Sequence, residues 1–260
     1  MLILCIFVRK TIYSIFTEAL YITVEKSASL CYNNLSETSK DKNMSTKYIL
    51  FDLDGTLSDS APGITKSVAY ALEKMGIEEK AENLGYFVGP PLLDAFREKY
   101  GMTAEEADTT LKYFRERFQV KGILENAPYD GVKELLESLC NAGKKLVLAT
   151  SKPEKFAREI IERYGFTKYF VFIGGASMNE KNRIRKDEVI EYCLAECKIT
   201  DVSGCIMVGD RYHDVEGAEK FGISTVGVLY GYGTKDELLN AGAVAVCETP
   251  ESLCEYLLKE

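Results

Sequence analysis

Apolar runs of four or five residues recur from residue 44 onward, with helical patterns between them. Each run ends in glycine or polar residues, and the predicted strands cover residues 48–51, 145–149, 170–173, 205–208, 224–228 and 243–246. Continuous apolar runs of this length are typical of parallel strands that are buried on both faces. The amphipathic segments predict helices that end near residues 141, 164, 197, 221 and 258. This alternation predicts an α/β fold with a doubly wound parallel sheet.

Residues 61–128 differ because helices, and no strand, are predicted there before residue 144. An apolar stripe at helical spacing consists of Ile64, Val68, Leu72 and Met75. Further helical patterns cover 91–100 and 104–121, which together predict an all-helical insert between the first two strands. The turn Gly89-Pro90-Pro91-Leu92 is either a simple helix start or a substrate-facing loop of a lid.

The first 43 residues do not show this alternation of strands and helices. Their apolar run at 1–8 is too short to span a bilayer, and Arg9 and Lys10 follow it, whereas a secretory signal has its positive charges first. The polar stretch 36–45 predicts disorder. Because Met44 shortly precedes the first strand, we expect translation to begin there. Residues 1–43 would then be an untranslated or disordered leader. The alternative interpretation of these residues is a peripheral membrane anchor.

Composition narrows the class of protein. A chain of 260 residues with 46% hydrophobic residues can bury one α/β core with an insert, and its net charge of −8 argues against nucleic-acid binding. The eight cysteines include no C-x-x-C pair, which favours reduced thiols and a cytoplasmic location over zinc or disulfides. His213 is the only histidine, so multi-histidine metal sites are excluded. We expect no stable membrane association; composition does not predict an oligomeric state.

Two carboxylates, Asp52 and Asp54, follow the first predicted strand. Their spacing of two sends both side chains toward one face, and Gly55 allows the backbone to bend closely around a ligand. Ligands of open α/β sheets bind at this carboxyl edge. Mutual repulsion of the two carboxylates requires a cation or a shared proton. The alternative interpretation is a simple Asp-Gly hairpin turn.

Later strand ends supply complementary groups. The Thr150 hydroxyl and the amides of Ser151 and Lys152 form a plausible anion site at a helix N-terminus, although Thr-Ser-Lys-Pro also fits a plain N-cap. Lys186 opens a helix, where the helix dipole disfavours a cation, so its position indicates another role.

A second pair of acids, Asp210 and Asp214, follows a later strand. If they converge with the first pair, the repulsion calls for a hard divalent cation, and Mg²⁺ suits such a carboxylate group. In isolation this segment also fits an N-cap. We interpret the neighbouring His213 as structural rather than catalytic.

Four segments together resemble the haloacid dehalogenase superfamily of phosphohydrolases. They are FDLDGTL at 51–57, TSKP at 150–153, the lysine at 186 before a helix, and GDRYHD at 209–214. The resemblance covers residues 44–260. It implies a Rossmann-like core domain formed by 44–60 and 129–260, with a type 1 helical cap domain at 61–128 that closes over the site.

The resemblance also implies roles for individual residues. Asp52 would attack phosphorus, and Asp54, kept protonated by negative surroundings, would protonate the leaving alcohol. The implied phosphoryl-binding residues are Gly55, Thr56, Thr150, Ser151 and Lys186. Mg²⁺ would be held by Asp52, the backbone carbonyl of Asp54, and Asp210. Asp214 would support the site and position Lys186.

The resemblance implies a small-molecule phosphomonoester as the substrate. Within the superfamily, the helical cap and the GDRYHD segment are most similar to those of phosphoglycolate phosphatase-like proteins. A 5′-nucleotidase, a β-phosphoglucomutase-like isomerase and a non-catalytic regulatory or binding protein are the alternatives. Thr56 disfavours the mutase, in which valine is usual at this position. Dehalogenases lack an acid equivalent to Asp54, which disfavours that activity.

Overall fold

A computed structural model describes residues 46–178 and 182–260 of the chain. The described residues form one compact unit. The predicted leader at 1–43 and the predicted start at Met44 lie outside the described residues. Within the described ranges, no helix combines the length and the apolar character needed to cross a bilayer.

The described residues contain a six-stranded sheet in which all neighbouring strands are parallel. Its order is β5-β4-β1-β6-β7-β8. The strands are β1 (Tyr48–Phe51), β4 (Lys145–Pro153), β5 (Phe170–Ala176), β6 (Cys205–Gly209), β7 (Ser224–Val228) and β8 (Ala245–Cys247). The predicted doubly wound α/β fold is confirmed.

Helices connect the strands and cover both faces of the sheet. In the core they are α5 (Val132–Asn141), α6 (Glu154–Arg163), α7 (Lys186–Glu196), α8 (Tyr212–Glu219), α9 (Lys235–Asn240) and α10 (Pro250–Lys259). Ile49 and Phe51 pack with residues of α5, α6 and α10, whereas Leu50 packs with residues of α7 and α8. Alternate side chains of a strand point to opposite faces, so β1 contributes to both hydrophobic layers.

Strand β1 lies at the point where the strand order reverses. The chain continues from β1 to β4 and β5 on one side and then crosses to β6 on the other. In such sheets the connections diverge at this point and leave a crevice beyond the carboxyl ends of the strands. The residues that follow β1 therefore lie where an open α/β sheet binds its ligands.

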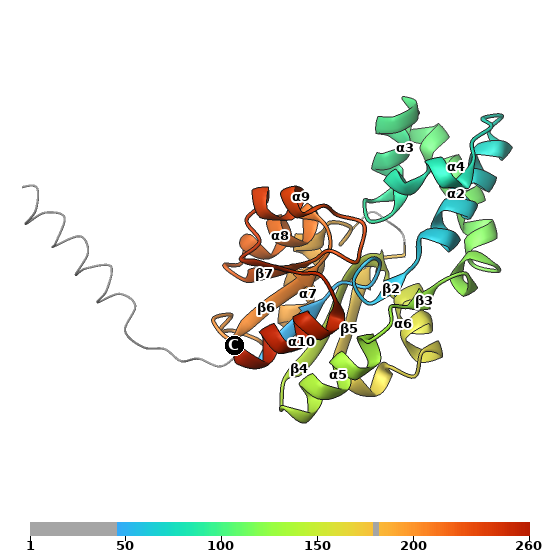
Figure 1. Cartoon of the computed structure of the whole chain (residues 1–260). Helices are drawn as coiled ribbons and strands as arrows, with labels where there is room; N and C mark the ends of the chain where they lie inside the picture. Colours follow the sequence, from blue (N-terminus) through green and yellow to red (C-terminus); the bar gives the residue numbers. More distant parts are fainter. Residues whose placement is uncertain (1–45, 179–181) are drawn as a thin grey trace, which may run out of the picture. The chain divides into compact units, whose positions relative to one another are not determined.

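The insert between β1 and β4 contains α2 (Ala61–Lys74), α3 (Leu92–Tyr100) and α4 (Ala104–Phe118), with short 3₁₀ helices η1 (Ala81–Asn83), η2 (Gly85–Phe87) and η3 (Gly122–Leu124). Helix α4 begins at a capping box in which Thr103 and Glu106 satisfy each other's backbone N–H groups. Figure 1 shows these helices grouped together at one end of the sheet. The division into cap and core domains stays a prediction.

Two details of the prediction were wrong. Strands β2 (Ser58–Asp59) and β3 (Ala127–Pro128) pair antiparallel where the chain enters and leaves the insert, although no strand was expected between residues 51 and 144. Strand β4 was expected to end at Ala149 but continues to Pro153, and β5 runs through both glycines to Ala176. The pairing of Thr150 with Gly175 extends both strands.

Candidate active site

Asp52 follows β1 and is buried. Its backbone N–H donates to the Val208 carbonyl at 2.9 Å, which extends the β1–β6 pairing to this residue. Its Oδ1 lies 2.7 Å from the ammonium nitrogen of Lys186. Burial raises the pKa of Asp52, and the nearby Lys186 opposes that shift.

Lys186 is the first residue of α7, as predicted, and its ammonium group contacts three oxygen atoms. The ammonium lies 2.8 Å from Asp214 Oδ1 and donates to the Ala149 carbonyl at 3.0 Å, in addition to its contact with Asp52. Burial alone would lower the pKa of Lys186, but the two carboxylates outweigh burial and raise it. Lys186 is therefore a fixed positive charge between two acids.

Asp210 follows β6 and is completely buried. Its Oδ2 accepts a 2.8 Å hydrogen bond from the Tyr232 amide, and its Oδ1 lies 3.5 Å from the Thr56 hydroxyl. Gly55 has a φ of +83°, and a Cβ there would lie 2.1 Å from Asp210 Oδ2. Glycine is thus required both by the backbone conformation and by the close approach of Asp210. Burial, together with the charges of Asp214 and Asp52, raises the pKa of Asp210 well above its ordinary range.

Three carboxylates form a cluster that fits a metal ion. Oxygen atoms of Asp52, Asp210 and Asp214 all lie within 4.8 Å of one another. Lys186 balances one of the three negative charges, so two remain, and no described lysine or arginine pairs with Asp210. Buried oxygen donors with two uncompensated charges suit a hard divalent cation. This cluster could therefore hold a metal ion; it contains the predicted ligands Asp52 and Asp210, and in addition Asp214, which was predicted only to support the site.

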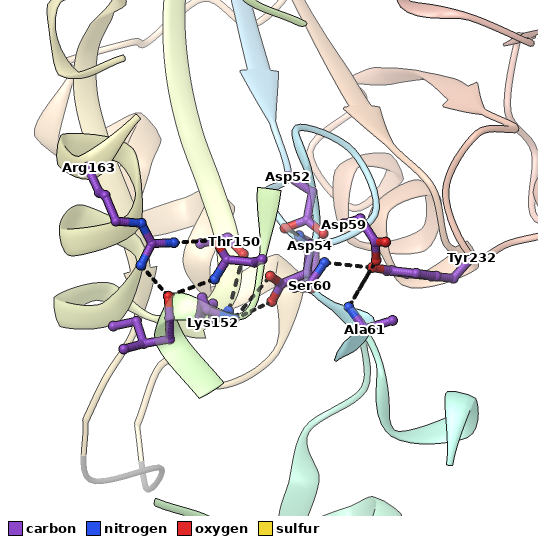
Figure 2. Close-up of polar contacts among 12 residues, drawn as sticks. Asp52, Asp54, Asp59, Ser60, Ala61, Thr150, Lys152, Arg163 and Tyr232 are labelled. Atoms are coloured by element: carbon purple, nitrogen blue, oxygen red, sulfur yellow. Dashed lines mark hydrogen bonds and ion pairs between the residues drawn. The ribbon is translucent and has the colours of Figure 1, made fainter. Parts of the chain in front are cut away.

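Asp54 has a partner that the sequence did not indicate. The ammonium of Lys152 lies 2.8 Å and 3.0 Å from its two carboxylate oxygens (Figure 2). The expectation that negative charges surround Asp54 did not include this cation. Thr150 and Lys152 are both buried, but the pairing of β4 with β5 is irregular between Thr150 and Pro153, so a longer predicted strand would not by itself have pointed Lys152 toward the site.

The predicted anion site at 150–152 needs a related correction. Helix α6 begins only at Glu154 with Pro153 as its N-cap residue, so the amides of Ser151 and Lys152 belong to β4 and not to a helix N-terminus. The Thr150 hydroxyl is buried and accepts a 3.2 Å hydrogen bond from the Lys152 amide. The phosphoryl-binding roles of Thr150 and Ser151, and those of Gly55 and Thr56, stay predictions.

A cavity borders Asp54 on the side of the helical insert. Its empty volume is about 570 Å³, part of which is open to solvent. Its lining is largely apolar and consists of Ile64, Leu92 and the rings of Phe87, Phe114 and Phe118 from the insert and of Phe156 from α6. Arg115, Ser151 and Lys152 add polar groups. The loop formed by Gly89, Pro90 and Pro91 also lines this space, which is the position that its interpretation as a substrate-facing loop requires.

Tyr232 holds the first connection to the insert. Its hydroxyl accepts hydrogen bonds from the amides of Ser60 at 2.8 Å and Ala61 at 2.9 Å, and donates to Asp59 Oδ1 at 2.8 Å (Figure 2). On the second connection, Arg163 donates to the Asn126 side chain. No local pattern marked either residue, because both act on partners distant along the chain.

We expect Tyr232→Phe to lower the free energy of unfolding by about 1–3 kcal/mol, because the Ser60 amide loses its hydroxyl acceptor. Urea unfolding monitored by circular dichroism measures this change. Tyr230→Phe is the matched control, since the buried Tyr230 hydroxyl has no hydrogen-bond partner among the described residues. Equal losses in the two variants would show that the Tyr232 hydroxyl does not stabilise this connection.

His213 takes no part in the carboxylate cluster. Its ring lies against that of Tyr212, with 3.7 Å between the ring centroids. Burial lowers its pKa, and the charges of Arg211 and Lys186 lower it further. These surroundings agree with the structural interpretation of His213.

Comparisons with known proteins identify the family. The model of the family described as haloacid dehalogenase-like hydrolase matches residues 49–228. A 5′-nucleotidase of Pseudomonas aeruginosa is 44% identical over 191 residues, which cover 73% of this chain and 86% of that protein. A phosphoglycolate phosphatase of Vibrio parahaemolyticus is 30% identical over 221 residues, covering 81% and 96%.

The fold has solved counterparts as well. The crystal structure of a predicted phosphatase from Clostridium acetobutylicum superposes with a TM-score of 0.80 at 44% identity, covering 83% of this chain and 99% of that one. The match to the family model extends from β1 through β7 and so includes all the acids described above. The chain therefore belongs to the haloacid dehalogenase-like hydrolase family, among its phosphatases.

Proposed function

We propose that this protein hydrolyses phosphomonoesters of small molecules in a magnesium-dependent reaction that passes through a phosphorylated Asp52. The observation that carries the proposal is the position of Asp52 beyond β1, 2.7 Å from Lys186 and in one cluster with Asp210. A carboxylate beside a fixed cation is a nucleophile that can approach a phosphate dianion. The proposal includes a cytoplasmic location, where the buried thiols of Cys193 and Cys205 would stay reduced.

Asp52 and Asp54 take different parts in the proposed reaction. Asp52 is ionised when it attacks phosphorus, so it needs no base, and the bond from phosphorus to the alcohol oxygen breaks as the new bond forms. Asp54 takes up a proton on one carboxyl oxygen, which gives up one of its two contacts with Lys152, and donates that proton to the alcohol oxygen. Asp54 then accepts a proton from the water that hydrolyses the aspartyl-phosphate. The position of Asp54 beside the cavity supports this role, because the alcohol has space there.

The remaining residues would hold the phosphoryl group. Lys186 offers a positive charge, while Thr150, Ser151, Gly55 and Thr56 form the surrounding strand and loop ends. The carboxylates of Asp52 and Asp210 and the backbone carbonyl of Asp54 would hold Mg²⁺, and Asp214 would keep Lys186 in place, as its 2.8 Å contact supports. When bound, Mg²⁺ would offset the negative charge of the phosphoryl oxygens.

We propose 5′-nucleotidase activity first, with phosphoglycolate phosphatase-like activity, which the sequence resemblance implied, as the second candidate. Two observations favour the nucleotidase. The 5′-nucleotidase relative has the higher identity, and the aromatic lining of the cavity beside Asp54 offers a surface for a planar base. A glycolate group would leave much of that apolar surface without contacts.

Release of inorganic phosphate tests the proposed function. The substrates are phosphoglycolate, nucleoside 5′-monophosphates, sugar phosphates and phosphotyrosine, each assayed with Mg²⁺. We expect phosphate from at least one ester, loss of this activity after treatment with EDTA, and recovery on adding Mg²⁺. Absence of phosphate release from every ester would contradict the proposal and favour a binding protein. Conversion of a sugar phosphate to an isomer without release would instead indicate a mutase.

A further inference from the structure

We propose that Lys152 is a positioning residue that orients Asp54 toward the leaving alcohol, and that Phe118 of the helical insert holds Lys152 in this position. The inference rests on the proposed function, because it concerns the acid that protonates the leaving group. It adds a residue to which neither the sequence nor the comparisons assign such a role.

The contact between Lys152 and Asp54 fixes the carboxylate in two directions. The ammonium reaches both carboxylate oxygens, at 2.8 Å and 3.0 Å, so rotation of the carboxylate would break one contact. Both side chains are largely shielded, with 4% of Lys152 and 11% of Asp54 exposed. An ion pair that water cannot easily replace restrains its partners far more than a surface pair does.

The backbone directs Lys152 to this place. Strand β4 is extended through Pro153, and the Lys152 amide donates to the Thr150 hydroxyl at 3.2 Å. The pairing of β4 with β5 is irregular between Thr150 and Pro153, so this hydrogen bond, and not regular strand alternation, ties Lys152 to Thr150. Figure 2 shows Lys152 reaching across from β4 to Asp54.

Phe118 covers the ammonium from the side of the insert. The Lys152 nitrogen lies 5.0 Å from the centroid of the Phe118 ring, within the range of a cation–π interaction. The ring is held in turn by Phe114, stacked at 5.2 Å, and by Phe156, edge-on at 5.5 Å. The ammonium thus lies between a carboxylate of the core and an aromatic ring of α4.

The two buried lysines of the site serve different acids. Lys186 contacts Asp52 and Asp214, whereas the ion-pair partner of Lys152 is Asp54. Lys152 also lines the cavity together with Asp54 and Phe118. Lys152 is therefore placed to influence departure of the alcohol, and Lys186 to influence transfer of the phosphoryl group.

A positioning role predicts an effect that depends on the leaving group. Departure of an alkyl alcohol needs a proton, whereas 4-nitrophenolate leaves readily without one. We expect Lys152→Met to lower kcat/KM for an alkyl phosphomonoester by about 10²-fold, the lower end of what general acid catalysis contributes. For 4-nitrophenyl phosphate we expect the decrease to stay below about 5-fold, since that reaction needs little general acid catalysis.

The experiment compares these two esters across a set of variants. Lys155→Met, an exposed lysine of α6, is the matched control and should change neither rate. Lys152→Arg should recover part of the alkyl ester activity. Adding Lys152→Met to Asp54→Asn should change the alkyl rate little, because the group that Lys152 orients is already removed. Phe118→Leu keeps Lys152 and should lower kcat/KM for the alkyl ester by a smaller factor, again with little change for 4-nitrophenyl phosphate. This variant also tests the inference if Lys152→Met fails to fold.

The results separate the inference from the function on which it rests. If the wild type hydrolyses both esters and Lys152→Met or Phe118→Leu slows them equally, Lys152 has only a structural role and the inference is overturned. Unchanged rates in these variants overturn it as well. If the wild type hydrolyses neither these esters nor the compounds of the wider screen, the proposed function itself fails.

Discussion

Asp52→Asn should abolish phosphate release, lowering kcat by about 10⁴-fold or more, the scale typical of removing a nucleophile. Asparagine has nearly the same shape as aspartate, and its amide oxygen can still accept from Lys186, which lies 2.7 Å from Asp52 Oδ1. The fold should therefore survive, and the loss should be chemical. The measurement is kcat on the best ester of the substrate screen, with circular dichroism to confirm folding.

A direct assay of the intermediate complements this rate measurement. Acid quenching of the wild type during turnover, followed by peptide mass spectrometry, should place one phosphoryl group on the peptide that contains Asp52. Asp130→Asn, which changes an exposed acid of the core, is the matched control and should keep full activity. Substantial turnover by Asp52→Asn, or a phosphoryl group on another residue, would rule out Asp52 as the nucleophile.

Lys186→Met should destabilise the fold and remove activity together. The substitution leaves Asp52 and Asp214 without the ammonium that lies 2.7 Å and 2.8 Å from them. Removing one partner of a buried ionic group typically costs about 3–5 kcal/mol, because the remaining charge stays buried and unpaired. Loss of a positive charge beside the transferring phosphoryl group should lower kcat by about 10²–10³-fold as well.

A surface lysine gives the matched comparison. Lys220 lies 2.7 Å from Asp187, as close as Lys186 lies to Asp52, but its side chain is 54% exposed. Lys220→Met should cost no more than about 1 kcal/mol, because water screens an exposed pair. Urea unfolding of both variants tests the contrast. Similar losses of stability would show that Lys186 is not a buried structural charge.

The two lysines of the site also show where sequence reasoning succeeded and where it did not. Lys186 could be selected because it opens a helix at a position that the helix dipole disfavours for a cation. No local rule marked Lys152. Its importance depends on the continuation of β4 beyond Ala149 and on an acid 98 residues earlier in the chain.

The sequence by itself determined the class of fold and the edge at which the site lies. Apolar runs and helical periods are local properties, and parallel strands place their carboxyl ends along one edge whatever their order. Asp52, Asp54 and Asp210 were therefore predictable as neighbours. Only the tertiary structure decided which cation pairs with which acid, how aromatic rings enclose the cavity, and that Tyr232 holds Ser60 across 172 residues. These contacts depend on strand register and on the packing of the insert against the core, which no local pattern in the chain specifies.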